Sequence, residues 1–162
     1  MKENEIPEGF TLRLAIVDAV PVLEFGVAML VLATKFHSGL FAFGAICCFL
    51  AGSGKVIWKI LLATKKKNIL WLNKQFRYVM STGFALMLIA LIFNRKSLSF
   101  KAIFAAVTGF PACIFFLVGI AGMCVMGVFG AKLDNSVVAN NWKEQIVNLI
   151  AQGMILIGII LC

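Results

Sequence analysis

Charged side chains are scarce in this sequence, and acidic ones are the scarcest. Of its 162 residues only 14% are charged, with 7 Asp and Glu against 15 Lys and Arg, whereas 62% are hydrophobic. Soluble domains are about half apolar and about a quarter charged. So few charges cannot cover the surface of a soluble protein of this length, and the composition therefore indicates a membrane protein.

Residues that build metal and catalytic sites are also few. The single His and five Cys, with no C-x-x-C pair, give no recognisable zinc or haem site. The few carboxylates fall short of the dense set that a two-metal phosphotransfer site needs. The segment 51–55 lacks the first Gly and the following Ser or Thr of a phosphate-binding loop. We predict no catalytic residues, no metal and no cofactor, and an enzyme is the less favoured class.

Long apolar runs separated by short polar connections dominate the chain. A membrane-spanning helix needs about 20 mostly apolar residues. We therefore predict an all-α fold, a polytopic integral membrane protein with one transmembrane domain of five transmembrane helices in a small bundle. The predicted spans are residues 12–33, 39–62, 78–93, 102–131 and 145–161. The fourth is too long for one upright helix, so a tilt or bend is expected at 109–111.

The basic residues predict how the bundle is oriented. They cluster between the apolar runs, mostly on the side that holds the N-terminus, and positive charge marks the cytoplasmic side. We expect a plasma-membrane protein with a cytoplasmic N-terminus and an external C-terminus. Lys65, Lys66 and Lys67, followed by Trp71, predict a contact with anionic lipid headgroups at the inner face. No basic face interleaved with aromatic side chains indicates nucleic-acid binding.

Glu24 is the most informative residue, because it falls near the middle of the first apolar run. An ionisable group at membrane depth is costly and marks a functional site by default. No basic residue matches its expected depth. We expect Glu24 to be protonated, hydrogen-bonded to amides, or facing water or a bound cation.

Other polar residues are expected to lie beside Glu24 inside the membrane. Asp18 and Lys55 fall at similar depths on antiparallel neighbours, which predicts an ion pair, while Lys59 is expected to snorkel toward the interface. In the last run, Asn141, Gln145, Asn148 and Gln152 follow the i, i+4, i+7, i+11 spacing of one helix face. Lipid cannot satisfy an amide, so this face should point into the bundle.

Two interpretations of this polar seam remain open. Its amides and ion pair could hold helices together, or they could line a path for an ion or solute. We favour a transporter or channel-like protein for a cation, proton or small polar solute, acting as a homo-oligomer or with a partner membrane subunit. The expected ion- or solute-binding residues are Glu24, Asp18, Lys55, Asn148 and Gln152. The alternatives are a non-transporting subunit or scaffold whose seam docks partner helices, and an integral-membrane enzyme acting on lipids.

Overall fold

The computed structural model describes residues 11–95, 98–133 and 137–162, and these form six α-helices. Five are long and apolar enough to cross a membrane, as the sequence predicted. They are α1 (Leu12–Phe36), α2 (Gly39–Lys65), α3 (Leu70–Phe93), α5 (Ala112–Lys132) and α6 (Val138–Leu161), and the short α4 (Phe100–Thr108) precedes α5.

Hydroxyl side chains begin three of these helices. The Oγ atoms of Thr11, Ser38 and Ser99 accept hydrogen bonds from backbone N–H groups in the first turns of α1, α2 and α4. Such capping satisfies donors that have no partner inside the helix. Ser38 also accepts a 2.9 Å hydrogen bond from Nδ2 of Asn94, which ties the start of α2 to the end of α3.

The helices differ most from the predicted spans at three places. The helix α3 begins at Leu70 rather than residue 78, and α6 begins at Val138 rather than residue 145. The fourth run is divided into α4 and α5 at 109–111, where a bend was expected. Predicted starts followed the onset of apolar residues, but backbone hydrogen bonding continues through polar turns, so the helices extend past the apolar region.

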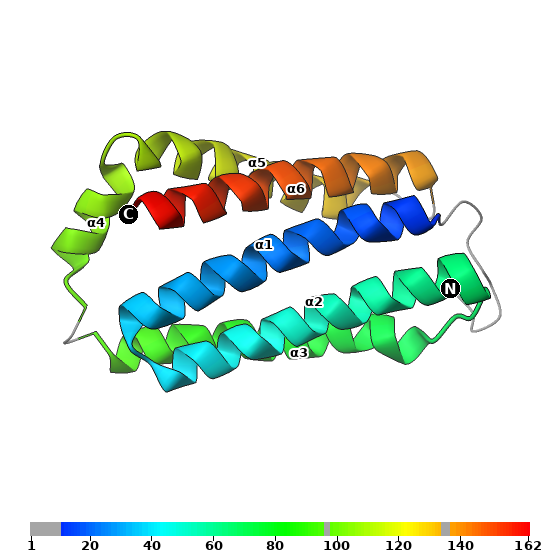
Figure 1. Ribbon diagram of the computed structural model, residues 1–162, viewed down its shortest axis with the longest axis horizontal. Helices are drawn as coiled ribbons and strands as arrows, with labels where there is room; N and C mark the ends of the chain where they lie inside the picture. Colours follow the sequence, from blue (N-terminus) through cyan, green and yellow to red (C-terminus); the bar gives the residue numbers. More distant parts are fainter. Residues whose placement is uncertain (1–10, 96–97, 134–136) are drawn as a thin grey trace.

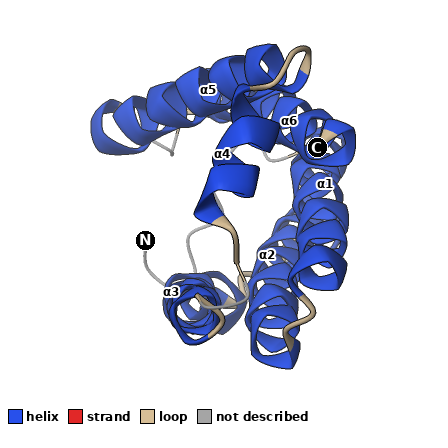
Figure 2. Cartoon of the chain, turned by 90° about the vertical axis from the view of Figure 1, so that its left-hand side faces the viewer, coloured by secondary structure: helices blue, strands red, loops and turns tan. Residues whose placement is uncertain are grey.

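The five long helices are arranged as an open arc in the order α3, α2, α1, α6, α5. Each packs on its neighbour in this order, and the end-on view shows α3 and α5 at the two ends of the arc (Figure 2). Helices α1 and α6 run in the same direction (Figure 1). Near their far ends, Nζ of Lys35 donates a 2.9 Å hydrogen bond to the carbonyl of Ile159.

Small residues allow the closest helix contacts. A Cβ placed on Gly83 of α3 would lie only 2.7 Å from the carbonyl oxygen of Gly44 in α2. Beside this crossing, Phe41, Ala45, Cys48, Met87 and Ala90 form a buried apolar cluster. Close backbone approach through small residues is the usual packing chemistry of membrane helices.

The outward faces of the long helices are apolar. Large side chains such as Leu30, Leu88 and Leu117 are more than half exposed, Leu117 to 68%. In water such a surface would be an aggregation hazard, whereas in a bilayer it is the contact with lipid. The five apolar helices and their apolar surface fit a multi-pass membrane protein.

Candidate functional site

A cleft of about 360 Å³ lies on the inner side of the arc and is lined by all five long helices. We call it the polar cleft, because polar side chains gather in its wall although the helices are apolar outside. These side chains are Asp18, Lys55, Glu144, Gln145, Asn148 and Gln152. The structure therefore brings together four of the predicted site residues, Asp18, Lys55, Asn148 and Gln152.

Asp18 forms its ion pair with Lys59, not with Lys55 as the sequence analysis predicted. Nζ of Lys59 lies 2.8 Å from Oδ2 of Asp18, and Lys59 is only 3% exposed instead of snorkelling to the interface. The predicted pairing counted depth from residue 62, but α2 continues to Lys65. Counted from the real helix ends, Lys59 rather than Lys55 is level with Asp18.

Lys55 lies one helical turn from Lys59 and faces the cleft. Its Nζ is 4.7 Å from the centroid of the Phe76 ring of α3, a cation–π distance. Within the described parts of the chain, Lys55 has no carboxylate at ion-pair distance. The ring holds this ammonium group at the α2–α3 wall of the cleft.

Glu144 is a cleft residue that the sequence analysis missed. It is buried, and it interacts electrostatically with Lys55, Lys59 and Asp18. Because the last span was predicted to start at residue 145, Glu144 was placed outside the membrane as a flanking charge. Its spacing of i, i+4 with Asn148 was the signal that could have found it. Together the two acids and two lysines form a cluster in which the formal charges balance.

The amide face of α6 points into the bundle, as its spacing predicted. Asn141 and Gln145 are buried, whereas Asn148 and Gln152 are partly buried in the cleft wall. Nε2 of Gln152 lies 3.7 Å from Sδ of Met123 in α5. Gln145 is 5% exposed, and its Oε1 has no hydrogen-bond partner in the described part of the chain.

Glu24 lies beside the polar cleft rather than in its wall. Its carboxyl group packs on α6, where Oε1 is 3.1 Å from the position that a Cβ on Gly153 would take. Oε2 is buried, and no described residue forms a hydrogen bond with it. Pro21 and Phe25, which flank Glu24 along α1, do line the cleft. The predicted seam is thus a cleft with one additional, partly buried carboxyl group where α1 packs on α6.

Gln75 is a second residue that sequence reasoning missed. Its Nε2 donates 3.1 Å hydrogen bonds to the carbonyl oxygens of Ala51 in α2 and Leu72 in its own helix. The amide lies over Gly54, which has no side chain to displace it. This contact fixes α3 against α2 beside Lys55. Sequence reasoning missed it because Gln75 precedes residue 78, where the span was predicted to begin.

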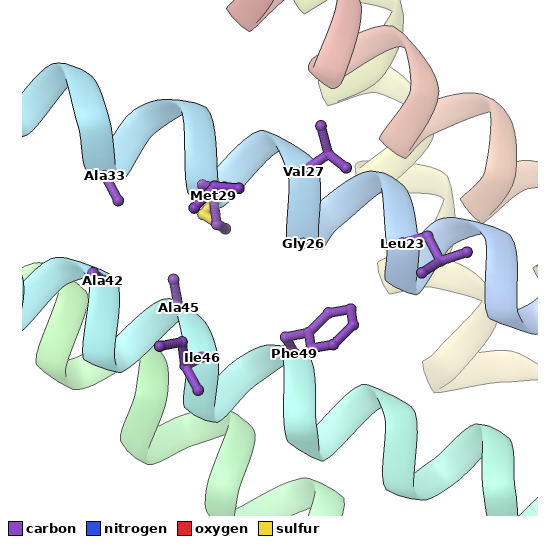
Figure 3. A pocket seen from close by; sticks show the side chains of 10 residues that line it. Leu23, Gly26, Val27, Met29, Ala33, Ala42, Ala45, Ile46 and Phe49 are labelled. Carbon is purple, nitrogen blue, oxygen red and sulfur yellow. The ribbon is translucent and has the colours of Figure 1, made fainter.

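A second, apolar groove of about 320 Å³ is lined by residues of α1 and α2. The Phe49 ring lies against Gly26, and the other lining residues include Leu23, Met29 and Ile46 (Figure 3). All the described residues that line this groove are apolar. A polar solute would find no partner there, so the polar cleft is the better candidate site.

The predicted lipid-headgroup residues are grouped at the end of the bundle where α2 ends and α3 begins. Lys65, Lys66 and Lys67 are exposed, and Trp71 is 72% exposed. Lys66 adopts the left-handed conformation that ends α2. We call these four residues the basic patch.

No protein-family model matches this chain, and no curated protein or solved structure is significantly similar to it. Among the described residues, no group of three or more His, Cys, Asp and Glu side chains is placed to hold a metal ion.

Proposed function

We propose that this protein is a small transporter or channel-like protein that moves a cation, a proton or a small polar solute. The polar cleft would be the solute site, and Glu24 would bind the proton or cation. The observation that carries this proposal is the gathering of six polar side chains around one cleft inside an otherwise apolar bundle. Polar groups at membrane depth are expensive, and ligand sites between helices are built from such convergent groups.

Two buried oxygen atoms that lack hydrogen-bond partners among the described residues support a role beyond holding helices together. Oε2 of Glu24 and Oε1 of Gln145 are both buried, and neither has a hydrogen-bond partner in the described part of the chain. If the seam served only to join helices, its members would satisfy one another, because an unmatched buried polar atom costs about 1–3 kcal/mol. Unmatched groups are better explained by a bound proton, ion or solute.

The open arc supports assembly into an oligomer. In the described part of one chain, α3 and α5 stand at opposite ends of the arc and do not pack on each other (Figure 2). A second copy of the chain would complete the wall. The same opening favours the alternative function, a membrane subunit whose cleft receives a helix of a partner protein.

We also propose that the basic patch contacts anionic lipids and lies on the cytoplasmic side of a plasma membrane, so that the C-terminus lies outside. Exposed lysines beside an exposed Trp suit the headgroup region of an anionic leaflet.

Uptake by the purified protein in liposomes tests the transport proposal. We expect wild-type protein to take up labelled small polar solutes faster than protein-free liposomes, and Gln152→Leu to reduce uptake at least tenfold. Lys143→Gln, on the exposed side of the same helix, is the matched control and should leave uptake unchanged. If wild-type uptake equals that of empty liposomes while the protein instead co-purifies with a membrane partner, the subunit alternative replaces transport.

A further inference from the structure

Among the described residues that line the cleft, Lys55 is a cation without an ion-pair partner. Asp18 already neutralises Lys59 at 2.8 Å, whereas Lys55 has a ring face as its neighbour and no ion-pair partner in the described residues. A lysine held by an aromatic ring keeps its charge and can still donate hydrogen bonds on its open side. A carboxylate of a bound molecule is the natural partner for such a group.

The α6 wall of the cleft contains a hydrogen-bond acceptor without a donor in the described residues. Gln145 of α6 is 5% exposed and lines the cleft, and its Oε1 is unmatched among the described residues. The carboxylate of Glu144 lies next to it in the sequence and lines the same wall. An amide oxygen beside a carboxylate favours a donor that also carries positive charge, such as an ammonium group.

Charge balance restricts the ligand further. Asp18, Lys55 and Glu144 line the cleft and Lys59 pairs with Asp18, so the formal charges of these four described residues sum to zero. A ligand with a net charge would leave an uncompensated charge in a low-dielectric site, which is strongly unfavourable. A molecule with one group of each sign preserves the balance.

Apolar and aromatic side chains form the rest of the wall, with Phe76, Met80 and Phe84 from α3 and Met123 and Met126 from α5. Methionines adapt to ligands of irregular shape, and a volume of about 360 Å³ suits a small molecule. We infer that the polar cleft binds an amphipathic zwitterion, namely an amino acid-like molecule whose carboxylate meets Lys55, whose ammonium group meets Gln145, and whose apolar portion lies among the α3 and α5 side chains. This inference deepens the proposed function and rests on its assignment of the cleft as the solute site.

Binding by matched probes tests the inference on the full-length purified protein. Labelled phenylalanine and leucine would be displaced by phenylalanine, by 3-phenylpropanoate, which lacks the ammonium group, and by phenethylamine, which lacks the carboxylate. We expect each truncated probe to compete at least about tenfold more weakly than phenylalanine, because each leaves a buried polar group unmatched.

Two substitutions assign the two ends of the ligand. Lys55→Met should weaken phenylalanine binding about tenfold and remove its advantage over phenethylamine, whereas Lys55→Arg should keep that advantage. Gln145→Leu should reduce the advantage of phenylalanine over 3-phenylpropanoate, although Glu144 remains, and should leave its advantage over phenethylamine unchanged. Lys101→Met, an exposed position on α4, is the control and should bind like wild type. If a cleft variant does not fold, the ranking of the three probes on wild-type protein decides the question.

Equal competition by the three probes, or no binding of phenylalanine and leucine, would overturn the inference. This result is separate from the test of transport. If phenylalanine binds more tightly than both truncated probes but no uptake occurs, the ligand class is upheld and transport is refuted. If uptake occurs but the three probes compete equally, only the ligand class is refuted.

Discussion

Breaking the Asp18–Lys59 ion pair should destabilise the protein more than removing the charge of Lys55, the other lysine of the cluster. In Asp18→Asn the side-chain shape is kept, but the Lys59 ammonium group stays buried without its 2.8 Å carboxylate partner. At that distance, with an effective dielectric constant of about 20, the lost attraction is about 6 kcal/mol. Breaking a buried pair on one side costs about 3–5 kcal/mol in practice.

The value expected here is about 3 kcal/mol, at the lower end of that range. Glu144 still attracts Lys59 and offsets part of the loss, although Lys55 repels it. Replacing both partners in Asp18→Leu/Lys59→Met removes both buried charges, so we expect the double variant to regain most of the stability and to lie within about 1 kcal/mol of wild type.

The free energy of unfolding of the purified protein in mixed detergent micelles, titrated with a denaturing detergent, measures these differences. Lys55→Met is the matched control, because it removes a lysine from the same helix face that has no ion pair in the described residues, and it should cost about 1 kcal/mol or less. The reasoning is refuted if Lys55→Met destabilises the protein as much as Asp18→Asn does. It is also refuted if the double variant Asp18→Leu/Lys59→Met is destabilised as much as Asp18→Asn.

Three further predictions concern packing, lipid and orientation. Gly83→Ala should lower the unfolding free energy by about 1–3 kcal/mol, because its Cβ would lie 2.7 Å from a backbone oxygen. The control Gly127→Ala, whose Cβ would meet open space, should be neutral or slightly stabilising, so equal losses would contradict the α2–α3 packing. Replacing the lysines at 65–67 by Gln should lower the number of phosphatidylglycerol molecules retained in native mass spectrometry, at about 1 kcal/mol of attraction per lysine, without changing phosphatidylcholine retention. A membrane-impermeant maleimide should label the exposed Cys162 from outside intact cells. Labelling only after permeabilisation would contradict the proposed orientation.

The fold class was predictable because lipid imposes a simple rule. A spanning segment must satisfy its backbone internally and present apolar side chains, so long apolar runs identify the five helices directly. The polar ends of α3 and α6 do not follow this rule. Lys74, Gln75 and Glu144 belong to helices that extend past the apolar region, and this is why Gln75 and Glu144 were not recognised as interior groups.

The candidate site was predictable in part. Helical spacing alone places Gln145, Asn148 and Gln152 on one inward face, and the structure agrees. The partner of Asp18 was not predictable, because Lys55 and Lys59 share a face and differ by one turn, so an error of three residues in the end of α2 selects the wrong lysine. The arrangement of the helices in an open arc was also not predictable, because apolar runs do not specify which helices are neighbours.

The most direct test of the central claim compares proton and cation flux into liposomes that contain wild-type protein or Glu24→Gln. An entrapped pH-sensitive dye reports protons, labelled Na⁺ and K⁺ report cations, and each flux is measured with and without phenylalanine. The substitution keeps the size of the side chain and its contact with Gly153, and it removes the titratable carboxyl group. We predict flux in the wild type that falls to the protein-free level in Glu24→Gln, with Lys143→Gln unchanged. Equal flux in wild type and Glu24→Gln, or none in wild type under any condition, would contradict the claim that Glu24 carries the transported proton or cation.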